Sequence, residues 1–304
     1  MNIVRVYEVD ESNPTGRLLY TGFVSQYAPY TNGSEQGVNI TLLGLVSFLS
    51  LAYYKSGSSY TVTHTNQDPA DILKAIIDHF NTIYPVSSTA FPNGLIHYAG
   101  GHIASVGTTI DLEFEDQHWD EAVAKVFDYV PEGWYWRIDP DGNVYLQEKP
   151  ATPTHAFTVG KDTETLEVTR NTEKIKNLLT FRDSAAGVTT FQDATSQSTY
   201  GVREEIYTAS ETADATAISE FGGAFIGNNK DPKVNARMVI NLNYDIESIK
   251  PGDTCRVNNF KLGADILGDN MQIVSVSYTP DKATLTLEQD ITFGKELQNF
   301  FSNA

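Results

Sequence analysis

The 304-residue chain has one cysteine, Cys255, and few basic residues: 21 Lys and Arg stand against 39 Asp and Glu, a formal net charge of −18. A single cysteine excludes an intramolecular disulfide framework and a thiolate-rich zinc or iron–sulfur site. We expect Cys255 to be a small buried hydrophobe in a strand. The shortage of positive charge argues against a nucleic-acid reader, because such proteins neutralise phosphate with Lys and Arg.

Long apolar runs are also absent. The longest apolar-leaning run, residues 42–54, is broken by glycine and serine and falls short of the roughly 18 residues that a transmembrane helix requires. Residues 1–8 alternate like a strand and lack the apolar core of a signal peptide. We therefore expect no targeting segment and no membrane insertion by this chain, which stays inside or is exported by other means.

The composition is otherwise that of a folded chain. Apolar residues make up 40% and charged residues 20%, far from the charge-rich, aromatic-poor composition of disordered segments. The length suggests about two domains. No short-period repeat is visible.

Residues 1–65 have the pattern of strands separated by turns. Apolar residues alternate near 4–7, at 18–26 and at 37–44, and the last run passes into Leu45, Phe48, Leu49 and Leu51 at the spacing of a short helix. We interpret this segment as a β-rich piece that is too small to close alone.

Residues 66–150 predict a compact α+β unit. Asp68 before Pro69 is a helix start, and apolar residues recur at helical spacing from Ile72 to Phe80. A second helix is predicted from about Asp116 to Val130. A β-hairpin follows, with arms at 134–138 and 144–147 and a turn at 139–143.

Strands dominate again after a linker at 150–153. The predicted strands are 178–182, 188–192, 237–242, 253–257, 271–278 and 283–289. One helix, 211–225, interrupts them, and Gly222 and Gly223 weaken its end. Strands around one helix indicate a barrel or sandwich with a flanking helix. The two β-rich pieces on either side of the α+β unit are candidates for distant copies of one another.

Metal-binding patterns are weak. His97 and His102 lie five residues apart in a glycine-rich stretch, where a metal site needs a further ligand that the sequence does not identify, so we interpret them as loop histidines. The turn at 139–143 superficially resembles a calcium loop, but its glycine is at the fourth position and Pro150 stands where the bidentate Glu should be. We interpret that turn as a hairpin turn.

Catalytic patterns are equally weak. Trp119, Trp134 and Trp136 lie near Glu132, Asp139 and Asp141, a combination found in sugar-processing sites, but their spacing favours a small core. The serines at 58–59 and 196–198 lack a nucleophile elbow, and the glycines at 222–227 follow a helix instead of opening one. We therefore predict no enzymatic activity, no cofactor, and no catalytic, cofactor-binding or metal-binding residues.

The order of several short motifs is more informative. A strand at 177–181 is followed by Ser198–Glu205, an alanine-rich helix, the segment 249–257 with Pro251-Gly252-Asp253, and closing strands at 273–278 and 283–287. In this order they resemble the baseplate hub, or tail-tip hub, of tailed bacteriophages, a family related to the base of the type VI secretion spike. Residues 19–24 and 40–45 resemble the first barrel of that family, and 119–122 leading to 134–146 resembles its inserted domain.

The resemblance implies a mainly β fold with two tail-tube-like antiparallel β-barrels, which form a pseudo-repeat, and a small inserted α+β domain. The first barrel is residues 1–65, completed by later strands or by a partner. The inserted domain is 66–150, and the second tube-like barrel is 151–304 with the flanking helix 211–225. Family members usually have additional strands before residues 3–9, so the first barrel is trimmed, a neighbouring protein completes it, or the chain is a fragment.

The resemblance also implies a function. The chain would be a structural virion protein whose homotrimer forms a pseudo-six-fold ring at the phage tail tip or baseplate, after assembly in the bacterial host cytoplasm. The implied partners are the tail tube or distal tail protein, the tape-measure protein, and a tip or spike protein. DNA passes through the channel without specific binding, and acidic residues on the channel wall would repel its phosphates.

Two alternatives remain open at this point. The hub of a contractile injection or type VI-like secretion apparatus shares the expected fold. A carbohydrate-binding or glycan-cleaving tail module would make the tryptophan-rich region functional.

Overall fold

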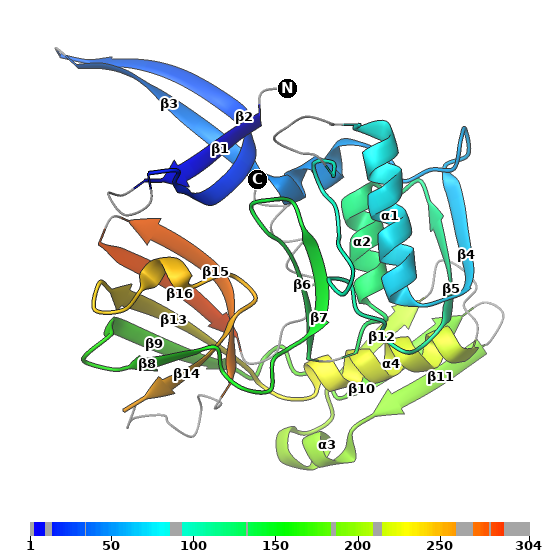
Figure 1. Cartoon of the computed structure of the whole chain (residues 1–304). Helices are drawn as coiled ribbons and strands as arrows, with labels where there is room; N and C mark the ends of the chain where they lie inside the picture. The colour runs from blue at the N-terminus through cyan, green and yellow to red at the C-terminus, as the bar shows by residue number, and fades with distance from the viewer. Residues whose placement is uncertain are drawn as a thin grey trace.

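The structure is a computed structural model that describes residues 3–9, 14–33, 35–85, 93–131, 133–183, 187–208, 215–259, 270–279 and 281–288. Within these residues the chain is mainly β, with its α-helices gathered on one side (Figure 1). Among the described helices, none combines the length and the apolarity needed to cross a membrane.

The first part is a three-stranded antiparallel sheet in the order β1-β2-β3. Its elements are β1 (Ile3–Glu8), β2 (Arg17–Asn32), β3 (Glu35–Gly44) and the following 3-10 helix η1 (Leu45–Leu51). The predicted strands and the short helix are confirmed, but the second strand continues to Asn32, which pairs with Glu35. Only the inner end of this sheet joins a core: the Phe23 and Phe48 rings lie 4.5 Å apart.

The predicted helices and hairpin of the α+β unit are also confirmed. The elements are β4 (Thr61–Gln67), α1 (Pro69–Ile83), β5 (Ile110–Glu115), α2 (Trp119–Phe127), β6 (Trp134–Ile138) and β7 (Val144–Glu148). The second helix begins later and ends earlier than expected. Its final turn is replaced by two hydrogen bonds between residues three apart, from Tyr129 N–H to the Val126 carbonyl and from Val130 N–H to the Phe127 carbonyl. One apolar core joins both helices, η1 and Phe23.

The turn at 139–143 closes the β6–β7 hairpin, as the sequence predicts. The Asp139 carboxylate accepts from the backbone N–H of Asn143 at 2.9 Å. Gly142 has φ +90°, and a Cβ there would lie 2.1 Å from the Leu95 carbonyl oxygen, so the turn requires glycine.

The Asp68 carboxylate begins α1 and also holds a distant loop. It accepts from Ala70 N–H at 2.8 Å, Ser105 Oγ at 2.6 Å, Val106 N–H at 3.2 Å and Gly107 N–H at 3.0 Å. Burial alone would raise the pKa of Asp68, but these four hydrogen bonds together lower it below the usual value.

Asp68→Ala should therefore lower the free energy of unfolding by about 1–2 kcal/mol at neutral pH, the usual effect of losing an N-cap. A carboxyl with a lowered folded-state pKa stabilises the fold above the unfolded value of about 3.9, and this contribution is lost as the pH falls through the folded value. Urea denaturation of the wild type and Asp68→Ala at pH 7 and pH 3 checks this. The difference between the two proteins should shrink at pH 3, and an unchanged difference would contradict the assignment.

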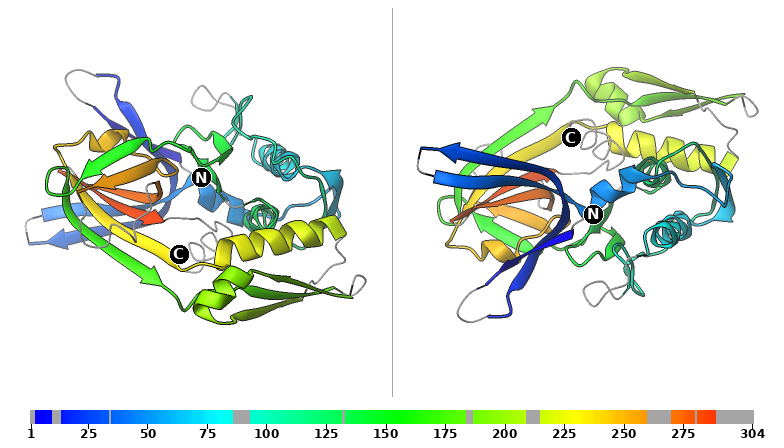
Figure 2. Two further views of the ribbon diagram at one scale, coloured as in Figure 1. Left: turned by 90° about the horizontal axis from the view of Figure 1, so that it is seen from below. Right: turned by 90° about the horizontal axis from the view of Figure 1, so that it is seen from above.

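The second large sheet has six strands in the order β8-β14-β15-β16-β13-β9. They are β8 (His155–Thr158), β9 (Thr163–Asn171), β13 (Lys233–Asn241), β14 (Thr254–Asn258), β15 (Met271–Thr279) and β16 (Lys282–Glu288). The sheet curls into a half-barrel around its own apolar core, and β1–β3 lie over one end of it (Figure 2). Within the described residues, the two expected barrels are thus represented by a three-stranded sheet and one half-barrel.

A third sheet, β11-β10-β12, differs from the expectation. It contains β10 (Leu178–Asp183), β11 (Gly187–Gln192) and β12 (Glu204–Thr208), next to the helices α3 (Ala194–Tyr200) and α4 (Ala215–Asn229). The first two of these strands were expected in the second barrel. They form a separate sheet because β12 pairs parallel with β10, and α4 packs on β10 and β11 through a core of its own.

The predicted helix 211–225 is α4, and residues 211–214 lie outside the described residues. The expectation that Gly222 and Gly223 weaken its end is wrong, since the helix continues to Asn229. A Cβ at Gly222 would lie 2.3 Å from the Phe191 ring, so this glycine permits the close approach of α4 to β11.

Candidate assembly surfaces

His97 and His102 lie in a loop against the β6–β7 hairpin. The His97 N–H donates to the Gly142 carbonyl at 2.8 Å, and the His102 ring stacks on Tyr145 at 4.3 Å. In the described part of the chain, no group of three or more His, Cys, Asp or Glu side chains is arranged to hold a metal ion.

The tryptophans belong to the core of the α+β unit. Trp119 is 0% exposed and Trp136 is 3% exposed, and the half-buried Trp134 packs against the same cluster. These positions agree with the expectation that the tryptophans form a small core. The two buried indoles present no open face on which a sugar ring could stack.

Cys255 is fully buried in β14, as the sequence predicts. Burial raises the pKa of its thiol to about 12, so the thiol stays protonated at neutral pH. Ser196 is also buried, and its hydroxyl donates to the Lys230 carbonyl between α3 and the end of α4. Both side chains therefore have structural positions.

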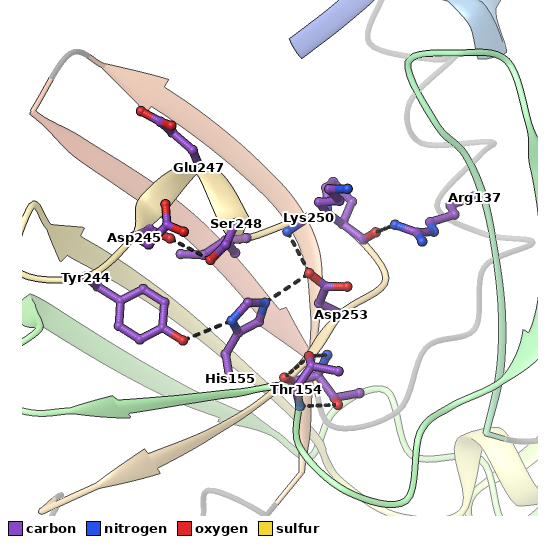
Figure 3. A network of polar contacts seen from close by, with 12 residues as sticks. Arg137, Thr154, His155, Tyr244, Asp245, Glu247, Ser248, Lys250 and Asp253 are labelled. Atoms are coloured by element: carbon purple, nitrogen blue, oxygen red, sulfur yellow. Dashed lines mark hydrogen bonds and ion pairs between the residues drawn. The ribbon is translucent and has the colours of Figure 1, made fainter. Parts of the chain in front are cut away.

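A polar network joins the half-barrel to the turn that precedes β14 (Figure 3). The buried His155 ring contacts the Tyr244 hydroxyl through Nδ1 at 3.0 Å and the Asp253 carboxylate through Nε2 at 3.0 Å. Asp253 also accepts from the Lys250 N–H at 2.8 Å. Because both ring nitrogens have partners within the protein, the imidazole is a structural tie between β8 and the turn.

The same turn contacts the α+β unit. Arg137 on β6 donates to the Pro251 carbonyl at 3.3 Å, and Gly252 lies against the Tyr135 ring, where a Cβ would be 3.0 Å away. A cavity of about 160 Å³ remains between β6, this turn and β15. The Pro251-Gly252-Asp253 motif thus fixes the half-barrel to the α+β unit. The sequence of this motif predicts a turn but does not predict this contact.

Two ion pairs hold the first sheet to its neighbours. Arg5 lies 3.5 Å from Asp141 in the β6–β7 turn, and Arg17 lies 3.8 Å from Glu247 beside the half-barrel. Such partly exposed pairs contribute little to stability, on the order of 0–1 kcal/mol each. They nevertheless mark where β1 and β2 contact the rest of the chain.

The outer half of the β2–β3 hairpin makes no such contacts and projects away from the body (Figure 1). We call residues 25–33 and 35–41 the arm. Its large apolar side chains are exposed: Tyr27 64%, Ile40 55%, Tyr30 43% and Val38 41%. A second exposed apolar group lies on and beside the β11-β10-β12 sheet: Val188 67%, Val202 63%, Ile206 49% and Tyr207 39%. Exposed apolar patches on soluble proteins frequently mark contact surfaces.

Comparisons with known proteins bear on the fold. No family model matches the sequence, and no curated protein matches it. Among solved structures, the chain is similar to the tail protein from Neisseria meningitidis MC58, with a TM-score of 0.65 and 12% identity over 90% of this chain and 81% of that one.

Two prophage proteins give comparable results. The 43 kDa tail protein of prophage MuSo2 from Shewanella oneidensis has a TM-score of 0.61 and 15% identity, covering 90% of this chain and 80% of that one. Prophage tail protein gp18 from Listeria monocytogenes EGD-e has a TM-score of 0.56 and 11% identity, covering 93% and 81%. The resemblance to phage tail proteins is confirmed at the level of the fold: this chain has the fold of these tail proteins.

Proposed function

We propose that the chain is a structural protein of a phage or prophage tail, the hub of a baseplate or tail tip, with three copies forming a ring. The observation that carries this proposal is the similarity of 90% of the chain to the Neisseria tail protein at a TM-score of 0.65. The positions of the sequence motifs support a structural role, because the Pro251-Gly252-Asp253 turn contacts the α+β unit and two of the three tryptophans are buried in its core.

In this proposal the three-stranded sheet and the half-barrel correspond to the two tube-like barrels. The domains are residues 1–65, 66–150 and 151–304, with the first completed by later strands or by a partner. Three copies then supply six such sheets around one axis, which would let a three-fold tip meet a six-fold tube. The placement of β1–β3 over one end of the half-barrel is compatible with such an arrangement (Figure 2).

The partners in this proposal are the tail tube or distal tail protein, the tape-measure protein, and a tip or spike protein, all within the virion. DNA passes through the ring without specific binding, because a chain with a net charge of −18 repels phosphate. The protein performs no catalysis. A hub of a contractile injection or type VI-like secretion apparatus would have the same geometry, and the identity of the tube protein that it binds distinguishes the two.

Sedimentation velocity tests the stoichiometry. We expect a species of about three times the 33.6 kDa of one chain when the chain is alone, or a heavier complex that contains three copies of it after addition of the matching tail-tube protein. Bovine serum albumin in place of the tube protein serves as the control for non-specific association. A strict monomer that also fails to bind tube protein would contradict the proposed function.

A further inference from the structure

The arm is a two-stranded ribbon with one apolar face. In the β2–β3 register, Tyr27 lies opposite Ile40 and Pro29 lies opposite Val38, so these four side chains share a face. All four are exposed. A two-stranded hairpin without a further layer is marginally stable in water, so this face lacks the packing partner that a stable ribbon needs.

The opposite face of the arm is less apolar. The Tyr30 ring lies over Gly37, where a Cβ would be 2.7 Å from the ring, so one side of the ring is covered although the side chain stays 43% exposed. The remaining neighbours on that face are small or polar, such as Ala28 and Asn39. Among the described residues of the arm, the face with Tyr27 and Ile40 is therefore the more apolar one.

The outer edge of the arm is also open. Within the described residues, β3 pairs only with β2, which leaves ten residues of edge strand from Glu35 to Gly44. Isolated edge strands are usually protected by lysine, proline or a bulge that prevents pairing with another chain. The sequence of β3 contains neither lysine nor proline, and the register shift of the β2–β3 pair lies on β2, between Val24 and Gln26 at the base of the arm.

Charge is almost absent from this region. Residues 18–54 contain one charged side chain, Glu35, although charged residues make up 20% of the chain. Charge depletion and tyrosine enrichment are typical of the buried centre of protein–protein interfaces. A basic partner would bind where acidic side chains gather, and the arm has only Glu35. We therefore do not expect a basic partner at the arm.

We infer that the arm is the contact through which one copy of this chain binds a second copy. Two copies that each carry a net charge of −18 repel each other. The arm carries a single charged side chain, so its burial joins two copies without desolvating several charges or bringing like charges together. This inference rests on the proposed function, because a ring of identical chains needs a contact between copies. It adds which residues make that contact.

The first experiment compares association constants by sedimentation velocity. The double variant Val38→Lys/Ile40→Lys places two charges on the arm at exposed positions, where they should leave the fold intact. We expect trimer association at least 100-fold weaker than in the wild type. The matched control is Ile83→Lys/Leu242→Lys, which changes two exposed side chains outside both apolar groups, 45% and 63% exposed, and should leave association unchanged.

A second experiment keeps the apolar face intact. Thr31→Cys introduces an exposed thiol near the arm tip, while the buried Cys255 provides little background reaction. A thiol-linked photo-crosslinker at that position should give covalent dimers of the chain. Asn235→Cys, exposed on β13, serves as the control and should give none.

The outcomes separate this inference from the proposed function. If the wild type and both lysine variants form equally stable trimers, the inference about the arm is wrong and the ring remains. If the arm variant still forms trimers but no longer binds tail-tube protein, the arm binds that protein and the inference is overturned. If the wild type does not self-associate under any of these conditions, both proposals fail. If the arm variant does not fold, the crosslinking result decides: absence of dimers contradicts the inference.

Discussion

Trp119→Ala should lower the free energy of unfolding by about 3–5 kcal/mol, the usual cost of removing a buried tryptophan side chain. The Trp119 indole is fully buried, and its ring lies 5.0 Å from the Phe80 ring and 5.9 Å from the Tyr84 ring. The substitution leaves a cavity between α1 and α2, the two helices that carry the core of the α+β unit.

The indole also makes a hydrogen bond that the variant loses. Trp119 Nε1 donates to His79 Nδ1 at 2.9 Å. Burial, with a contribution from Lys55, lowers the pKa of His79, which favours the neutral ring that can accept this bond. Trp119→Phe keeps most of the ring but loses the donor, so we expect a smaller effect of about 1–2 kcal/mol.

Urea denaturation followed by circular dichroism measures both variants without depending on tryptophan fluorescence. Tyr60→Ala, at a side chain that is 46% exposed, serves as the control and should change the free energy of unfolding by less than about 1 kcal/mol. An effect of Trp119→Ala no larger than that of Tyr60→Ala would show that the α1–α2 core is not packed as described.

Asn177→Ala is the second substitution with a large expected effect, about 3–4 kcal/mol, because it removes three hydrogen bonds from a fully buried side chain. The Asn177 Oδ1 accepts from Arg203 N–H at 2.8 Å, and Nδ2 donates to Ser196 Oγ at 3.1 Å and to the Gly201 carbonyl at 2.8 Å. These bonds hold α3 and the segment that enters β12 to the start of β10.

Thermal or urea unfolding of Asn177→Ala measures the effect. Asn235→Ala is the matched control, since Asn235 is exposed on β13, and should stay within about 0.5 kcal/mol of the wild type. Limited proteolysis provides an independent measurement, because the loss of these three hydrogen bonds should make the 193–204 segment more accessible to protease. A loss below about 1 kcal/mol with unchanged proteolysis would contradict the role of Asn177.

Local sequence signals predicted the elements whose causes are local. Asp68 and Pro69 mark the start of α1, and the observed N-cap bond to Ala70 is the contact that the pattern implies. The turn at 139–143 likewise joins β6 and β7 because Asp139 bonds Asn143 four residues away.

The contacts that assemble these elements were beyond sequence reasoning, because they join residues far apart in the chain. His155 and Asp253 are separated by 98 residues, and nothing in either neighbourhood predicts their bond. Gly222 was interpreted as a weak helix end, whereas its role depends on the Phe191 ring of another element. The parallel pairing of β12 with β10, which separates the third sheet from the half-barrel, also has no local signal.

The sequence contains part of the information on the arm. The alternation at 37–44 predicts a strand, and residues 18–54 contain almost no charge. Exposure of Tyr27 and Ile40 on one face became evident only with the β2–β3 register. Depletion of charge over a long segment of an otherwise charged chain is therefore the sequence feature that indicates this surface.

We propose that three copies of this chain form a ring. Negative-stain electron microscopy with class averaging is the decisive experiment, on the purified full chain alone and with the matching tail-tube protein. We expect ring-shaped particles with three-fold symmetry and a central opening. Particles that are single copies in both samples, or rings of a different symmetry, would contradict it.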